Sequence, residues 1–254
     1  MRVLFIGDVV GQSACAYLQQ RLPKFRHDNN VDVIIINGEN SADGNGITKY
    51  SAGQLFECGA DAITTGNHCF KRFEASTLFE ESDIVLRPAN FGADCAGKGV
   101  CILDMGGFSL AVVNLIGTAY MQPVDNPFKT VEAILSDIKT PNLIVDFLAE
   151  ATAEKKAMGF FLEGKVSAVL GTHTHVQTAD EAILSGHTAY ITDVGMTGVQ
   201  NSVLGVDKDV IIQRLRTYYP QRHTAAEGKI TMNAVLIDID KSCGKCTGIL
   251  RIND

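Results

Sequence analysis

Hydrophobic residues along the chain fall into short continuous runs that alternate with amphipathic stretches. The runs are rich in Val, Ile and Leu, which is typical of strands buried in a parallel sheet. They predict strands at residues 3–6, 31–36, 61–65, 84–86, 100–103, 110–115, 143–148, 166–170 and 189–192. Near the end of the chain, residues 230–239 and 247–252 alternate between apolar and polar positions and predict an antiparallel hairpin.

The stretches between the strands have apolar residues at helical spacing. Residues 12–26 show this pattern, with one face formed by Ala14, Leu18, Leu22 and Phe25. Further helices are predicted at residues 48–58, 128–138, 150–162 and 207–218. A hairpin is expected around Gly106-Gly107.

Strands and helices alternate over the whole length, which predicts a mostly parallel sheet with helices on its faces. Two such halves could stack sheet against sheet. No linker, low-complexity tract or internal repeat divides the chain, so we expect a single domain over residues 1–254.

The composition narrows the classes of protein. Of the 254 residues 46% are hydrophobic and 20% charged, which fits a chain with a core and excludes global disorder. With 22 Lys plus Arg and 29 Asp plus Glu, the net charge is −7, which argues against duplex nucleic acid as a partner. A small anionic substrate remains compatible, because a bound metal ion can reverse the local field.

Other features of the sequence point to an intracellular setting. No run approaches the roughly 18 apolar residues of a membrane helix, and the first residues carry no signal-peptide pattern. Seven scattered cysteines fit a reducing compartment. We therefore expect a soluble, cytoplasmic protein. The single C-x-x-C, Cys243 to Cys246, lacks a second pair of ligands and is interpreted as a turn between the terminal strands.

Polar residues that can bind metal follow four of the predicted strands. The motifs are Gly7-Asp8, Asn37-Gly38-Glu39-Asn40, Gly66-Asn67-His68 and Gly171-Thr172-His173-Thr174-His175. Glycine lets the backbone turn so that the next side chain leaves the sheet edge. Ligands bind beyond the carboxyl ends of strands in such folds, so we expect the four motifs to meet at one end of one sheet.

Each motif alone has a plain structural alternative. Asp8 can cap a helix, Asn40 can cap the next segment, and His68 can be an ordinary loop histidine. Together, however, carboxylate, amide and imidazole donors suit divalent iron, manganese or zinc. Glu39, in the middle of the series, has two oxygens that can bridge two ions. Two metal ions about 3.5–4 Å apart are the usual arrangement for phosphoryl transfer.

These motifs resemble the calcineurin-like metallophosphoesterases and, more closely, the YmdB-like branch of bacterial cyclic-nucleotide phosphodiesterases. Residues 124–128, 145–152 and 192–198 are also similar to that branch, so the resemblance covers essentially the whole chain. It implies a four-layer α/β/β/α sandwich in which two stacked mixed sheets are flanked by helices. It also implies hydrolysis of 2′,3′-cyclic nucleotides, with 3′,5′-cyclic nucleotides as a second substrate class.

The resemblance also implies roles for individual residues. A first metal ion would be held by Asp8, Glu39, Asn40 and His175. A second would be held by Glu39, Asn67 and His173, with Glu39 as the bridge. His68 would protonate the leaving ribose oxygen. The implied metals are iron or manganese, with zinc or magnesium as alternatives, and the family allows a homo-oligomer.

One departure from the family affects the second ion. Where the family has Asp-Phe-His-Ala-Glu with a ligand histidine, this chain has Asp146-Phe147-Leu148-Ala149-Glu150. Leu148 has no donor atom, so water, Asp146 or Glu150 would have to complete the site. Two other functions therefore stay open. One is a phosphomonoesterase on the same scaffold, and the other is a metal- or nucleotide-binding regulator with weak turnover.

Overall fold

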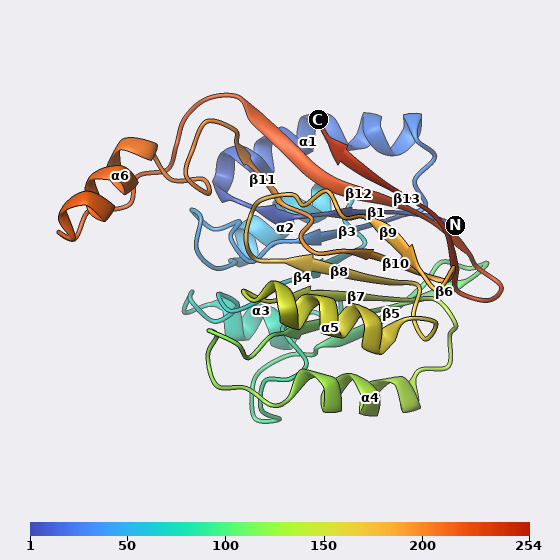
Figure 1. Cartoon of the computed structure of the whole chain (residues 1–254). Helices are drawn as coiled ribbons and strands as arrows, with labels where there is room; N and C mark the ends of the chain where they lie inside the picture. Colours follow the sequence, from blue (N-terminus) through green and yellow to red (C-terminus); the bar gives the residue numbers. More distant parts are fainter.

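The short apolar strands assemble into two stacked β-sheets, shown in Figure 1 for a computed structural model that describes residues 1–254. We call the seven-stranded sheet sheet A. Its strands follow the order β2-β11-β12-β1-β3-β4, with β13 paired to β12. They are β1 (Arg2–Ile6), β2 (Asp8–Val9), β3 (Val33–Asn37), β4 (Ala62–Thr64), β11 (Met196–Val199), β12 (Ile230–Asp240) and β13 (Lys245–Asn253).

The six-stranded sheet, sheet B, has the order β5-β6-β7-β8-β10-β9. Its four central strands are parallel, and an antiparallel strand lies at each edge. The strands are β5 (Val100–Asp104), β6 (Ser109–Ile116), β7 (Leu143–Leu148), β8 (Ala168–Thr172), β9 (Ala182–Leu184) and β10 (Thr188–Ile191). The hairpins predicted around Gly106-Gly107 and at the C-terminal end are confirmed as β5–β6 and β12–β13.

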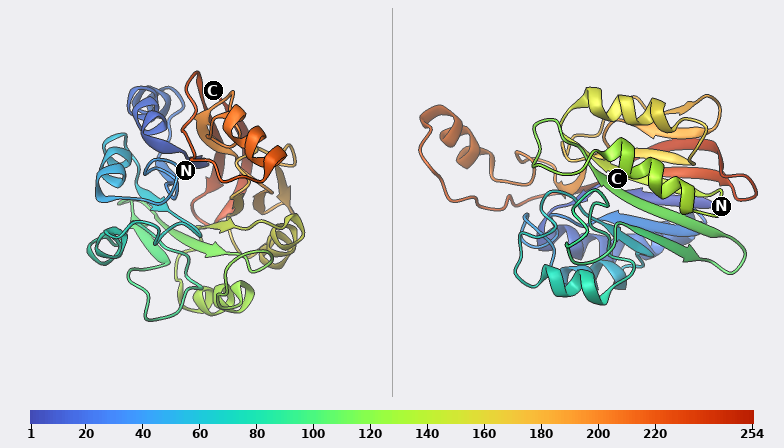
Figure 2. Two further views of the ribbon diagram at one scale, coloured as in Figure 1. Left: turned by 90° about the vertical axis from the view of Figure 1, so that its left-hand side faces the viewer. Right: turned by 90° about the horizontal axis from the view of Figure 1, so that it is seen from below.

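Helices cover the outer face of each sheet, as the two views of Figure 2 show. Sheet A packs against α1 (Gly11–Asp28), α2 (Lys49–Glu57) and α3 (Ala75–Glu81), and sheet B against α4 (Pro127–Asp137) and α5 (Thr152–Leu162). The sixth helix, α6 (Lys208–Thr217), projects away from the rest of the chain and buries none of its residues. No helix has the length and apolar character needed to cross a membrane.

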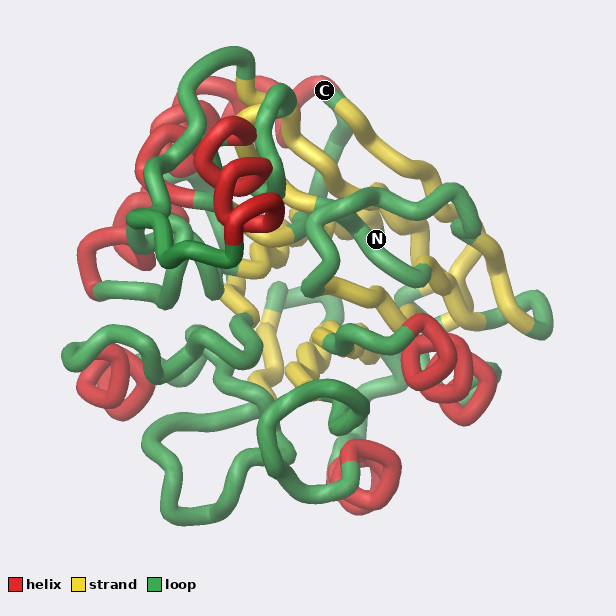
Figure 3. Tube along the Cα trace, turned by 60° about the vertical axis from the view of Figure 1, so that its left-hand side comes forward, coloured by secondary structure: helices red, strands yellow, loops and turns green.

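Strand periodicity divides the apolar side chains among three cores. In β1, Leu4 and Ile6 face the helices, whereas Val3 and Phe5 face sheet B. Strand β7 divides its side chains between the inter-sheet core and the core beneath α4 and α5 in the same way. Successive residues of a strand point to opposite faces, so a run buried on both faces is apolar throughout. Figure 3 shows the resulting arrangement, with strands inside and helices outside, and confirms the four-layer α/β/β/α sandwich.

The structure corrects two expectations about the strands. Residues 84–86 form no strand and make only isolated bridges, Ile63 to Val85 and Leu86 to Lys98. The four polar motifs do not follow strands of one sheet, because β8, which precedes His173, belongs to sheet B, while β1, β3 and β4 belong to sheet A. The motifs therefore meet where the ends of the two sheets adjoin.

Cys243 lies in the turn between β12 and β13, as expected, whereas Cys246 is already part of β13 and pairs with Ile239. Cys243 is exposed and Cys246 is buried. All seven cysteines are free, so no disulfide constrains the fold.

Gly171 is required by the close approach of two backbone segments. A Cβ at this position in β8 would overlap the carbonyl oxygen of Thr192. We expect Gly171→Ala to lower the free energy of unfolding by about 1–3 kcal/mol, because these backbone segments must move apart. Gly53 in α2 has open space around it, so Gly53→Ala should raise that free energy by about 0.5–1 kcal/mol. Urea unfolding followed by circular dichroism measures both, and an unchanged midpoint for Gly171→Ala would contradict the packing argument.

Candidate active site

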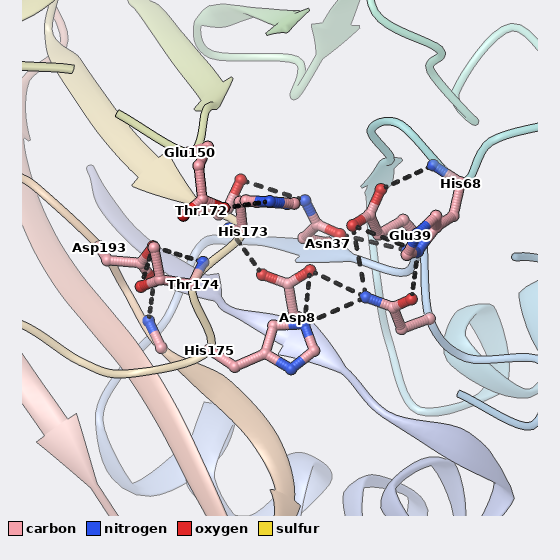
Figure 4. A network of polar contacts seen from close by, with 12 residues as sticks. Asp8, Asn37, Glu39, His68, Glu150, Thr172, His173, Thr174, His175 and Asp193 are labelled. Carbon is pink, nitrogen blue, oxygen red and sulfur yellow. Dashed lines mark hydrogen bonds and ion pairs between the residues drawn. The ribbon is translucent and has the colours of Figure 1, made fainter. Parts of the chain in front are cut away.

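Asp8 connects sheet A to residues 173–175, which follow β8 of sheet B and which we call the histidine loop. It follows Gly7, where a Cβ would overlap the carbonyl oxygen of Gly195, so only glycine allows the chain to pass at this point. The Asp8 side chain is fully buried. Its Oδ2 accepts a hydrogen bond from the His173 backbone N–H at 3.2 Å, and its Oδ1 lies 3.6 Å from His175 Nε2 (Figure 4).

Asn40 lies at the centre of the cluster of polar side chains. The loop after β3 places Glu39 and Asn40 in buried positions beside Asp8. Asn40 Nδ2 donates to Asp8 Oδ1 and to Glu39 Oε1, both at 3.3 Å, and lies 3.2 Å from His175 Nε2. One amide nitrogen therefore contacts two carboxylates and an imidazole.

The loop after β4 brings His68 to the same cluster. The backbone N–H of His68 donates to Glu39 Oε2 at 3.2 Å, and its Nδ1 lies 2.8 Å from Asn40 Oδ1. Burial and then the positive charge of Lys71 lower the pKa of His68 to about 4, so its imidazole is neutral at pH 7. The preceding residue, Asn67, has a buried Oδ1 that meets no hydrogen-bond donor.

Both histidines after β8 have an unusual backbone conformation. The φ angle is 108° at His173 and 64° at His175. Residues other than glycine rarely adopt positive φ, and strain of this kind clusters at functional sites. His173 Nε2 lies 2.9 Å from Glu150 Oε2, and His175 Nδ1 is buried without a partner.

The cluster buries three acidic side chains. Asp8, Glu39 and Asp146 are fully buried. Burial and the charge of Asp8 raise the pKa of Glu39 well above its usual value, and burial raises the pKa of Asp146 to about 7. Burial also tends to raise the pKa of Asp8, but the attraction of His175 outweighs it and lowers that pKa. A cation at this place would stabilise the ionised carboxylates.

The donor set fits a divalent transition metal ion. Carboxylate, amide and imidazole groups converge at this place. The buried atoms Asn67 Oδ1 and His175 Nδ1 have no hydrogen-bond partner within the protein and could bind a metal ion. In this structure the side chains bind one another, and no group of three or more His, Cys, Asp or Glu side chains is arranged to hold a metal ion.

Leu148 lies next to the carboxylate of Glu39. A Cβ on Gly66 would overlap both Leu148 Cδ1 and Glu39 Oε2, so the Leu148 methyl group and the Glu39 carboxylate oxygen are close neighbours. An isobutyl group thus lies against the carboxylate that the resemblance assigns to both metal ions. Leu148 itself has no atom that could bind a metal ion.

Asp146 is engaged by hydrogen-bond donors from both sheets. Its Oδ2 accepts from Asn37 Nδ2 at 3.0 Å and its Oδ1 from Thr172 Oγ1 at 2.7 Å, which holds the carboxylate between the two sheets. Glu150 stays available, because its side chain is 52% exposed and already reaches His173.

Sequence reasoning missed a second buried carboxylate beside the histidine loop. Asp193 accepts hydrogen bonds from Thr174 N at 2.9 Å, from Thr174 Oγ1 at 2.8 Å and from Lys155 Nζ at 2.7 Å. Its signal in the sequence is an aspartate directly after the buried run 189–192, with Gly195 two residues later. Its partner Lys155 gives no such signal, because it belongs to a helix 38 residues earlier.

A four-layer sandwich with a polar cluster at the strand ends between its sheets is the architecture of metallophosphoesterase-type phosphoesterases, and the fold places this chain among them. The chain belongs to the YmdB-like protein family, whose model matches residues 4–252. It is 45% identical over 254 residues to a 2′,3′-cyclic-nucleotide 2′-phosphodiesterase of Bacillus subtilis, covering 99% of this chain and 96% of that protein.

Two crystal structures have the same fold over the full chain. A hypothetical protein from Thermus thermophilus is 39% identical with a TM-score of 0.95, and the match covers 100% of this chain and 99% of that one. A structure described as a novel phosphatase, from Mycoplasma pneumoniae, is 29% identical with a TM-score of 0.94, covering 100% and 93%. The resemblance inferred from the sequence motifs is thereby confirmed.

We expect Leu148→His to increase the amount of metal that the protein binds. An imidazole at this position would add a donor beside Glu39 where the native side chain has none. Calorimetric titration with Mn²⁺ should show one tight and one weak ion in the unmodified protein and two tight ions in the variant. Leu148→Met, which keeps an apolar side chain of similar volume, is the control. Two tight ions in the unmodified protein would show that another donor, with Glu150 the first to examine, has replaced the histidine.

Proposed function

We propose that this chain is a metal-dependent phosphodiesterase that hydrolyses 2′,3′-cyclic nucleotides. The observation that carries the proposal is the position of His68, which is held by Asn40 against the buried carboxylates of Asp8 and Glu39. The 45% identity to a Bacillus subtilis 2′,3′-cyclic-nucleotide 2′-phosphodiesterase supports the substrate class.

The proposed ligands are the donors of the cluster. The first ion would be held by Asp8, Glu39, Asn40 and His175. The second would be held by Glu39, Asn67 and His173. When bound, two divalent ions polarise phosphoryl oxygens and lower the pKa of water, which supplies the nucleophile and stabilises negative charge. Iron or manganese suits this mixture of imidazole and oxygen donors, and zinc and magnesium are the alternatives.

His68 is the proposed general acid. Its Nδ1 binds Asn40 Oδ1, which leaves Nε2 to face the leaving group. Hydrolysis forms a bond from a water oxygen to phosphorus and breaks the bond from phosphorus to a ribose oxygen, which takes up a proton. Because burial keeps the free imidazole neutral at pH 7, the negative charge of the bound phosphodiester is needed to favour its protonated form.

Two observations favour other functions. The Mycoplasma pneumoniae relative is described as a phosphatase, which supports phosphomonoester hydrolysis on the same scaffold as an alternative function. The apolar side chain of Leu148 beside Glu39 supports the second alternative, a regulator that binds metal or nucleotide and hydrolyses its substrate slowly.

A comparison of substrates separates these alternatives. We expect 2′,3′-cyclic AMP to be hydrolysed with added Mn²⁺, and its monophosphate product to accumulate, because a diester has an alkoxide leaving group that benefits from a proton donor. Liquid chromatography of the reaction follows both species, and 3′,5′-cyclic AMP tests the second substrate class. Release of inorganic phosphate would favour the monoesterase. Binding of Mn²⁺ without turnover of any substrate would favour the regulator.

We expect His68→Ala to lower turnover of the cyclic nucleotide by about 10²–10⁴-fold, the usual contribution of a positioned acid, while metal content changes little. The loss should be smaller for a p-nitrophenyl phosphodiester, whose leaving group needs little protonation. Steady-state kinetics on both substrates gives the comparison. His27→Ala is the control, because the His27 side chain is 90% exposed and lies on α1. Equal losses on both substrates would mean that His68 binds the phosphate or shapes the site.

A further inference from the structure

A buried ion pair lies directly behind the histidine loop. Lys155 of α5 and Asp193, which follows β10, are each 1% exposed at their side chains, and Lys155 Nζ lies 2.7 Å from Asp193 Oδ2. Lysine is almost never fully buried unless it is paired. The proposed chemistry gives neither residue a role, so the presence of this pair beside the site needs another explanation.

Asp193 fixes the residue that lies between the two histidines. Its Oδ2 accepts from both the backbone N–H and the hydroxyl of Thr174, at 2.9 and 2.8 Å (Figure 4). Its Oδ1 accepts from Gly195 N at 2.8 Å. Thr174 joins His173 and His175, whose positive φ angles are unfavourable for side chains with a Cβ. Strained backbone of this kind persists only where surrounding contacts determine it.

We propose that Asp193 is a positioning residue that holds His173 and His175 in their strained conformation by binding Thr174 between them. The proposal rests on the proposed function, because it assigns to these imidazoles the task of binding metal. Lys155 has a supporting part. With Lys155, Thr174 and Gly195 as donors, both oxygens of Asp193 are engaged, so this carboxylate does not compete with Asp8 and Glu39 for the cation.

The experiment compares variants that remove different parts of the contacts that Asp193 makes with Thr174 and Lys155. Thr174→Val removes only the hydroxyl donor and leaves the ion pair intact, so it tests the proposal even if Asp193→Asn folds poorly. Thr174→Ser restores a hydroxyl. Asp180→Asn is the matched control, because Asp180 also binds Thr192, next to Asp193, but has no hydrogen bond or ion pair to residues 173–175.

A single tryptophan can report on the loop itself. The chain contains no tryptophan, and Val176, directly after His175, is 62% exposed. Val176→Trp therefore introduces the only indole emission of the protein at the end of the loop. All variants are compared in this background, by tryptophan emission and acrylamide quenching and by calorimetric titration with Mn²⁺ alone.

We expect Thr174→Val to weaken Mn²⁺ binding about 10-fold and Asp193→Asn up to about 100-fold, the range found for groups that orient metal ligands. Both should shift the tryptophan emission and increase its quenching by acrylamide. Thr174→Ser should regain most of the affinity, and Asp180→Asn should bind Mn²⁺ like its parent.

Two results would overturn the proposal. One is unchanged Mn²⁺ affinity in both Thr174→Val and Asp193→Asn. The other is unchanged tryptophan emission in both variants, which decides the question even if the parent protein binds no Mn²⁺. Failure of the proposed function looks different, because the parent would then hydrolyse no phosphodiester while the tryptophan signal still responded to Thr174→Val.

Discussion

The burial of three carboxyl groups at the junction of two sheets is the constraint on which the rest of the structure depends. Removing such groups from water is costly unless hydrogen-bond donors replace the solvent. Asp8 accepts a hydrogen bond from the backbone N–H of His173, and Glu39 accepts one from the backbone N–H of His68. Asp146 accepts hydrogen bonds from the side chains of Asn37 and Thr172. The donor His173 reaches Asp8 from the other sheet, and the donor Asn37 likewise reaches Asp146, so satisfying these two acids also fixes how the two sheets meet.

The sequence was sufficient to predict the features that depend on local pattern. Continuous apolar runs predicted most strands, and Gly-Asp or Gly-x-His-x-His after a run predicted which side chains would cluster. It could not assign β8 to its sheet, because a strand buried on both faces has the same apolar run in either sheet. Strands such as β2 are too short to leave a pattern, and the pairing of Lys155 with Asp193 depends on tertiary structure alone.

Carboxylates of the same chemistry have different tasks here because their partners differ. Asp193 has a lysine and three further donors, so its charge is balanced and its oxygens are engaged. Glu39 accepts from an amide N–H and a backbone N–H, lies beside the methyl groups of Leu148 and has no lysine or arginine partner, so its ionised form would be stabilised by a cation. The surrounding donors therefore distinguish a structural carboxylate from one that attracts a cation, although the sequence presents both after a strand.

The pairing of β1 with β12 has a consequence for synthesis of the chain on the ribosome. Strand β1 lies between β3 and β12, in a register that places Arg2 opposite Asp238. At about 5–20 residues per second, the nascent N-terminal strand waits roughly 10–50 s for that partner. During this interval Asp8 and Glu39 are present, but the sheet that carries them is incomplete and one edge of β1 is unpaired. Chaperone protection of this edge would matter most then, and a prematurely released chain would lack the enclosed acidic centre.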